Sequence, residues 1–242
     1  MMKRVVALLL LCILMGVFAV HGETTDHQTD VERLTLYFGK YEQDNNFDNG
    51  PEPIEWIVLD SQAGRALLIS KYALDCLPYH DKNEDVSWNS SSLRQWLNET
   101  FLSEAFTEME QKAVLSSMIA NDAKTQHSEW GSMESLDTED QLFVLSVKEA
   151  NDFFSDKKDR KVIGTEFARS KGAKFLGFTT IAYGETDWWL RSPGYTSSTA
   201  AVTDGAGAVG SNVFDSEARC YSYGNVNLTD FCVRPVIRVK VS

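Results

Sequence analysis

Apolar and polar residues alternate in the first part of the chain, as they do in strands with one buried face. Residues 34–38 carry apolar side chains at every second position and predict a strand. Residues 55–60 and 65–74 are apolar and flank a Ser-Gln-Ala-Gly segment, so they predict a hairpin. Residues 44–53 are rich in Asp, Asn, Gly and Pro and predict a loop.

The middle of the chain changes to helical spacing. Apolar residues between positions 93 and 101 recur at intervals of three and four, which predicts a helix whose N-cap lies within residues 90–92. Thr107 and Glu110 form a Thr-x-x-Glu sequence, which predicts a capping box and a second helix that reaches about Met118.

The segment after the second helix, residues 119–140, is polar and is expected to be an irregular surface excursion. Residues 142–147 are apolar and predict a strand that leads into a third helix. Ser146 and Glu149 would form its capping box. Its apolar face would consist of Ala150, Phe153 and Phe154.

The chain becomes all-β toward its C-terminus. A short helix is predicted to start at Thr165 and to stop at Gly172. Short apolar segments divided by Gly, Ser, Asn and Asp then predict strands over residues 188–193, 200–204, 207–210 and 232–241. Strands around a helical middle indicate an α+β domain rather than alternating βαβ units.

The N-terminus has the layout of a secretory signal peptide. Lys3 and Arg4 precede an unbroken apolar run over residues 5–20, which is shorter than the about 20 residues that a membrane span needs. We expect residues 1–22 to be cleaved after Gly22 and the protein to be secreted. The alternative is a retained N-terminal anchor.

The rest of the chain is predicted to be one domain. Residues 23–32 are polar and predict a disordered leader, and residues 33–242 are long enough to bury a substantial core. The formal net charge is −12, which argues against nucleic acid, whose phosphates need Lys and Arg partners. No second apolar stretch approaches membrane length, so we expect no membrane contact after cleavage.

Three cysteines follow the signal peptide. In an oxidising compartment Cys220 and Cys232 could form a disulfide that closes a short loop. The alternative is that both of them, together with Cys76, are buried free thiols. No Cys or His spacing suggests zinc.

Calcium has one candidate segment. Asp44, Asn46 and Asp48 are two positions apart and Glu55 stands at the twelfth position, as in an EF-hand loop. The glycine, however, is Gly50 at the seventh position rather than the sixth, and prolines follow it. A turn-rich connection is therefore the better interpretation. We expect no cofactor, with calcium as the weaker alternative.

No catalytic residues are predicted. The sequence contains neither a nucleophile elbow nor a His-Glu-x-x-His helix. His27, His80 and His127 lie in polar segments and are expected to be solvated. An uncharacterised extracellular enzyme, with acidic residues that converge in a loop-lined cleft, is the alternative.

Five motifs occur together in one order, and together they resemble a bacterial family described as domain of unknown function 6273, found in secreted and surface proteins. They are EPIEW at 52–56, WNSSSLRQWLN at 88–98, LFVLSVKEAN at 142–151, WWLRSPG at 188–194 and VRPVIRV at 233–239. The resemblance covers nearly all of the chain after the signal peptide. It implies no assigned activity.

The C-terminal half is also similar in layout to the formylglycine-generating enzyme group, a variant of the C-type lectin-like fold. This likeness implies a small antiparallel core sheet, two to four flanking helices and long loops. That group works through a close cysteine pair near its C-terminus. Because Cys220 and Cys232 are twelve positions apart here, the oxidase chemistry is not carried over.

Aromatic residues in loop-like segments are the candidate ligand-binding residues. Flat rings stack on sugars, and amides bind their hydroxyls. The candidates are Trp130, Tyr195, Tyr221, Tyr223 and Asn225. On the alternative interpretation these rings only pack loops onto the domain. We expect a non-catalytic domain that binds carbohydrate or peptide at the cell surface; a structural envelope or adhesion module is a further alternative.

Four residues are assigned structural roles. Arg191 and Arg234 follow apolar strand segments and stand close to prolines, so we expect partly buried clamps between the closing strands. Trp188 and Trp189 are expected in the core. Since successive residues of a strand point to opposite faces, at most one of the two should be fully buried.

Overall fold

The computed structural model describes residues 33–121, 136–173, 184–194, 196–209 and 223–241. These residues form two five-stranded sheets, a two-stranded hairpin and several short helices, and most strand pairs are antiparallel. The predicted α+β class is therefore correct. The predicted signal peptide and leader lie outside the described residues.

The first sheet has the strand order β1-β2-β3-β12-β7, and every pair in it is antiparallel. Its strands are β1 (Thr35–Tyr41), β2 (Glu52–Gln62), β3 (Arg65–Ser70), β12 (Val236–Lys240) and β7 (Leu142–Phe143). The predicted β2–β3 hairpin is confirmed. It turns at Ala63 and Gly64, whose φ angles of 50° and 72° are those of the turn type that matches strand twist.

The second sheet has the order β10-β9-β8-β11-β4. Its strands are β10 (Tyr223–Asn225), β9 (Thr199–Thr203), β8 (Trp188–Pro193), β11 (Cys232–Val233) and β4 (Asp75–Cys76). β11 runs parallel to β8 and antiparallel to β4. The last predicted strand is divided at Arg234 and Pro235, so its first half belongs to this sheet and its second half to the other.

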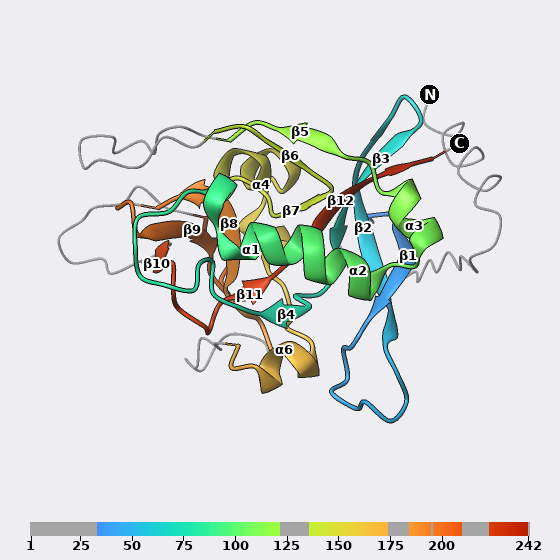
Figure 1. Cartoon of the computed structure of the whole chain (residues 1–242), viewed down its shortest axis with the longest axis horizontal. Coiled ribbons are helices and arrows are strands. Elements are labelled where there is room, and N and C mark those ends of the chain that lie inside the picture. The colour runs from blue at the N-terminus through green and yellow to red at the C-terminus, as the bar shows by residue number, and fades with distance from the viewer. Residues whose placement is uncertain (1–32, 122–135, 174–183, 195, 210–222, 242) are drawn as a thin grey trace.

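The helices are short. α1 (Ser92–Trp96), η2 (Leu97–Phe101) and α2 (Leu102–Ala105) follow one another directly, and this helical block crosses the front of the molecule between the two sheets (Figure 1). The other helices are η1 (Trp88–Ser90), α3 (Glu108–Ala113), α4 (Val147–Phe153), α5 (Lys157–Arg160) and α6 (Glu166–Ser170). None of the described helices is long and apolar enough to cross a membrane.

The predicted helix starts are confirmed by their hydrogen bonds. The Ser91 hydroxyl accepts from the N–H of Arg94 at the start of α1. Both capping boxes form, Thr107 with Glu110 at α3 and Ser146 with Glu149 at α4. The predicted short helix, α6, starts after Thr165, and Gly172 follows its end with a φ of 105°.

The predicted end of the second helix is wrong. α3 ends at Ala113, not at Met118, because the chain turns there into contact with β12. Val114 bridges Val239, and the Leu115 N–H donates to the carbonyl of Arg238 at 2.7 Å. A tertiary pairing has replaced the helical hydrogen bonds that the local sequence allowed.

The prediction of an irregular excursion over residues 119–140 is wrong at the two ends of this segment. β5 (Ser117–Ile119) pairs antiparallel with β6 (Thr138–Asp140). Residues 122–135, between them, lie outside the described residues. The predicted strand over residues 142–147 is limited to β7, the pair that bonds to β12.

The expectation that Trp188 and Trp189 cannot both be buried is wrong, because both are completely buried. They do point to opposite faces of β8, but other parts of the chain cover both faces. Trp189 packs against the rings of Tyr79 and Phe231 at centroid distances of 5.7 and 4.6 Å. Trp188 packs under the guanidinium of Arg234.

Gly39 fixes how β1 meets the helical block. The register of β1 against β2 shifts between Tyr37 and Lys40, and Gly39 has a φ of 68° there. A Cβ at this position would lie 2.6 Å from the carbonyl oxygen of Ala105 and from the Phe106 ring. Only glycine allows both this conformation and this close approach.

Candidate functional site

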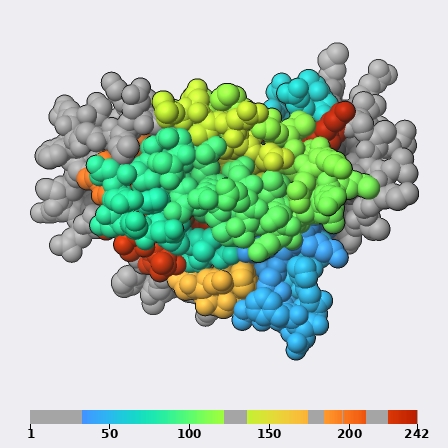
Figure 2. All heavy atoms as spheres, viewed as in Figure 1, coloured from blue at the N-terminus to red at the C-terminus, as the bar shows by residue number. Residues whose placement is uncertain are grey.

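A polar hollow opens between the helical block and the β5–β6 hairpin. Its volume is about 460 Å³. In Figure 2 the green helical block and the yellow-green residues around β6 meet on the visible face. We call it the polar hollow; its lining residues are Asn89, Ser90, Ser91, Arg94, Gln95, Asn98, Glu99, Ser116, Glu139 and Gln141.

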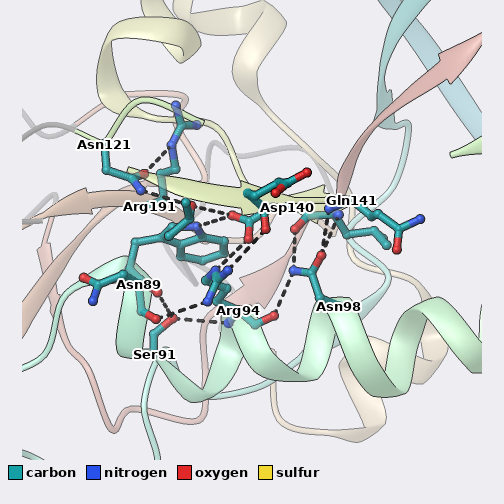
Figure 3. A network of polar contacts seen from close by, with 12 residues as sticks. Asn89, Ser91, Arg94, Asn98, Asn121, Asp140, Gln141 and Arg191 are labelled. Carbon is teal, nitrogen blue, oxygen red and sulfur yellow. Dashed lines mark hydrogen bonds and ion pairs between the residues drawn. The ribbon is translucent and has the colours of Figure 1, made fainter. Parts of the chain in front are cut away.

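Asp140 fixes the hairpin behind the polar hollow. Its side chain is completely buried, yet its carboxylate accepts three hydrogen bonds (Figure 3). The donors are Trp88 Nε1 at 2.9 Å, the Thr138 hydroxyl at 2.7 Å and Arg94 Nε at 2.6 Å. Because a buried carboxylate needs such partners, this network ties η1 and α1 to β6.

Arg94 is the side chain that spans the polar hollow. Besides Asp140, its guanidinium donates to the carbonyl oxygens of Asn89 and Glu139, at 3.2 and 3.3 Å. The charge is therefore paired and held at three points. Arg94 therefore forms a rigid part of the lining, and its charge is already paired with Asp140.

Asn98 joins the helical block to β7. Its Nδ2 donates to the carbonyls of Arg94 and Leu142, and its Oδ1 accepts from the N–H groups of Gln141 and Leu142. Asn98 belongs to η2, a π-helical turn. Such turns are rare in proteins overall, and those that occur are often found at functional sites.

The rim of the polar hollow carries exposed hydrogen-bonding groups. Gln95 donates to Glu99 at 3.0 Å, and the hydroxyl of Ser116 donates to Glu139 at 2.9 Å. These contacts orient the rim and leave further oxygen and nitrogen atoms facing solvent. Amides, hydroxyls and carboxylates in a fixed arrangement can bind a ligand rich in hydroxyl or amide groups.

A second hollow, of about 590 Å³, adjoins the first toward α3. The two share Ser116 and Gln141 in their linings. The other residues of the second hollow are Glu108, Gln111, Lys112 and Val114. Because they share these residues, the two hollows adjoin along one surface.

Three of the five ligand-binding residues predicted from sequence belong to segments that the structure does not describe. Trp130, Tyr195, Tyr221 and the possible disulfide partner Cys220 lie outside the described residues. Tyr223 and Asn225 belong to β10, at the edge of the second sheet, and Asn225 is exposed. Asn225 lines neither hollow.

The polar hollow was not predicted from the sequence. Its residues come from segments that are far apart in the chain, and each segment alone resembles an ordinary polar surface. One signal was present. The motif at residues 88–98 carries six of the polar residues that line the hollow, namely Asn89, Ser90, Ser91, Arg94, Gln95 and Asn98.

Arg191 is almost completely buried. It donates to the side chain of Asn121 (Figure 3). It also donates to the carbonyls of Val144 and Ala120, and it forms an ion pair with Glu149. Burial opposes ionisation of Glu149, but the hydrogen bond and charge of Arg191 outweigh it and lower the pKa of that carboxyl. Arg191 thus joins β8 to α4 and to the end of β5.

Arg234 is buried in a different way. Its Nε donates to the Ser70 carbonyl at 2.9 Å, whereas its Nη1 has no hydrogen-bond partner among the described residues. The guanidinium lies over the rings of Trp188 and Phe154, 5.2 and 5.4 Å from their centroids. Burial, with the positive charge of Arg33, lowers the pKa of Arg234 to about 9.

A cluster of carboxylates lies at the loop whose sequence has an EF-hand-like spacing. Glu42, Asp44 and Glu52 have oxygen atoms within 4.8 Å of one another. Glu55 lies apart from them and pairs with Lys71 at 3.0 Å. The carboxylates already accept bonds from backbone N–H groups of the loop, Glu42 from Asn46 and Glu52 from Gln43. The cluster is therefore explained by the loop itself.

A family model described as "Domain of unknown function (DUF6273)" matches residues 63–241. The match begins at the turn between β2 and β3, although β1 and β2 belong to the same sheet. No curated protein and no solved structure shows significant similarity to the chain.

Proposed function

Because the chain belongs to the family of domain of unknown function 6273, a description that assigns no activity, we propose its function from its own surface: it is a non-catalytic recognition domain whose polar hollow binds a carbohydrate. The observation that carries the proposal is the rim of amides, hydroxyls and carboxylates held above the Arg94–Asp140 pair. Sugars expose many hydroxyls, and these can donate to and accept from amides, hydroxyls and carboxylates.

Preorganisation supports binding at this place. The groups behind the rim are satisfied by their own hydrogen bonds, so a ligand does not have to order them. Binding then loses less free energy to immobilised side chains. The two exposed carboxylates of the lining, Glu99 and Glu139, favour a neutral ligand over an anionic one.

The adjoining second hollow supports an extended ligand. An oligosaccharide could contact the rim through one unit and the surface near α3 through another. A peptide is the other polymer of suitable shape. It is the less favoured ligand because no apolar side chain lines the first hollow to receive an anchor residue.

Two expectations from the sequence remain part of the proposed function. The mostly antiparallel sheets and the short helices support a C-type lectin-like core, and that core remains part of the proposal. The basic and apolar N-terminal segment supports secretion, which would bring the domain to carbohydrates at a cell surface.

A glycan array tests the proposal. We expect the full chain to bind at least one neutral oligosaccharide, and Gln95→Ala to weaken the signal because one rim hydrogen bond is lost. The matched control is Gln62→Ala, which removes another exposed glutamine at the tip of the β2–β3 hairpin. Equal loss in both variants, binding only to a peptide library, or no binding would refute carbohydrate recognition by the polar hollow.

A further inference from the structure

Cys76 and Cys232 lie directly opposite each other where β4 pairs antiparallel with β11. Their thiols are close enough for a side-chain hydrogen bond. The Cys76 Sγ also lies 3.1 Å from the carbonyl oxygen of Thr229. Both cysteines are buried, at 4% and 0% exposure. The two sulfur atoms therefore share one closed site.

The backbone geometry of this pair suits a covalent link. The Cys232 N–H donates to the Asp187 carbonyl at 2.9 Å, and the Cys76 N–H donates to the Asp75 side chain at 2.7 Å. Neither N–H bonds to the opposite cysteine, so this is a non-hydrogen-bonded pair, in which Cα atoms are about 4.5 Å apart. Disulfides span Cα distances of about 4.4–6.8 Å. The backbone spacing of the pair therefore permits a disulfide, and the two cysteines are free thiols in this structure.

A disulfide at this place in the fold would strengthen a short contact between two strands. β4 and β11 contact each other through only two residues each. This short contact attaches the edge strand β4 to a sheet built otherwise from the last third of the chain. A covalent link between positions so distant in sequence restricts the unfolded chain strongly.

We propose that Cys76 and Cys232 form a disulfide when the protein folds in the presence of a disulfide oxidant such as glutathione disulfide. The Cys232 thiolate attacks glutathione disulfide and releases one glutathione. The Cys76 thiolate then attacks the Cys232 sulfur of this mixed disulfide and releases the second glutathione. Two protons leave the protein thiols, and their two electrons reduce one glutathione disulfide to two glutathione molecules.

The bond forms during folding rather than after it. The hydrogen bond with Cys232, followed by burial and the negative charge of Asp75, raises the pKa of the Cys76 thiol in the folded protein. Thiolate is the attacking species, so the closed site reacts slowly once formed. The unfolded chain exposes both thiols and oxidises readily.

The experiment is refolding of the full chain in a glutathione redox buffer, followed by a non-reducing peptide map and a melting curve. We expect a peptide that joins Cys76 to Cys232. We also expect a melting temperature about 5–15 °C above that of the reduced protein. Cys220→Ser is the matched control, and it should retain both the linked peptide and the gain.

Cys76→Ala should lose the gain and melt like the reduced wild type. Wild type oxidised and wild type reduced are compared with each other as well, so the result does not depend on how well the variant folds. A peptide that joins Cys220 to Cys232, or free thiols at both Cys76 and Cys232 after refolding, would overturn the proposal.

Discussion

Arg191 in β8 forms an ion pair with Glu149, and the same carboxylate accepts a hydrogen bond from the Ser146 N–H at the start of α4. One carboxylate therefore closes the capping box of a helix and pairs with a buried cation of a strand. The arginine in turn reaches the end of β5 through Ala120 and Asn121. This pair connects the second sheet with the hairpin that borders the polar hollow.

Arg191→Met should destabilise the protein by about 3–5 kcal/mol, because it leaves a carboxylate and two carbonyls without their donor. The measurement is the free energy of unfolding in urea. Arg65→Met, at an exposed position of β3, is the control and should change stability by less than about 0.5 kcal/mol. A loss for Arg191→Met no larger than for the control would show that the pair does not join these elements.

Arg234→Met should cost less, about 1–2 kcal/mol, although Arg234 is equally buried. Among the described residues it donates one hydrogen bond and pairs with no acid, so its removal also relieves an unpaired buried charge. Methionine keeps contact with the ring of Trp188. If urea unfolding shows a larger loss of unfolding free energy for Arg234→Met than for Arg191→Met, the difference between the two arginines does not come from pairing with an acidic side chain.

The Arg191–Glu149 pair should also make stability depend on pH. The pKa of Glu149 is lowered in the folded state. Its contribution is therefore complete above the unfolded value of about 4.3 and is lost as the pH falls through the lower folded value. Glu149→Gln should differ from wild type most at about pH 7 and least at about pH 3. A difference in unfolding free energy that is constant across this range would contradict the assignment.

Asp140→Asn tests the support behind the polar hollow. The amide cannot accept from Trp88, Thr138 and Arg94 as the carboxylate does, so stability should fall by about 2–3 kcal/mol. Arg94 would lose its ion pair, and binding of the glycan identified on the array should weaken. Full affinity for the glycan at temperatures where the variant is folded would show that the Asp140 network does not support binding.

Alanine substitutions at two glycines distinguish the cost of backbone strain from the cost of steric overlap. Gly39 and Gly50 both have positive φ angles, 68° and 76°, but a Cβ at Gly50 would meet nothing within 4 Å. Gly50→Ala should cost about 1–2 kcal/mol. Gly39→Ala should cost about 1–3 kcal/mol more, because its Cβ would overlap the Ala105 carbonyl. Equal losses in thermal unfolding would mean that β1 does not pack closely on the helical block.

The elements that the sequence predicted correctly depend on neighbouring residues. The capping boxes at Thr107 and Ser146 join positions three apart, and the β2–β3 turn needs only Ala63 and Gly64. The end of α3 could not be predicted in this way, because it depends on pairing with β12 more than a hundred residues later.

The candidate site was harder to predict than the fold. The polar hollow requires that residues 89–99 meet residues 116 and 139–141, which only the folded chain brings together. Its side chains look like ordinary surface residues in the sequence. The burial of both Trp188 and Trp189 also escaped prediction, since strand alternation does not reveal that both faces are covered.

The most direct test of carbohydrate recognition is the position of the bound sugar in a crystal of the protein with the strongest array glycan. We predict that sugar hydroxyls contact Gln95, Glu99 and Glu139 at the rim of the polar hollow. A second unit should extend toward Ser116 and α3. A glycan bound instead beside Asn225 on β10, with the polar hollow holding only solvent, would contradict the account.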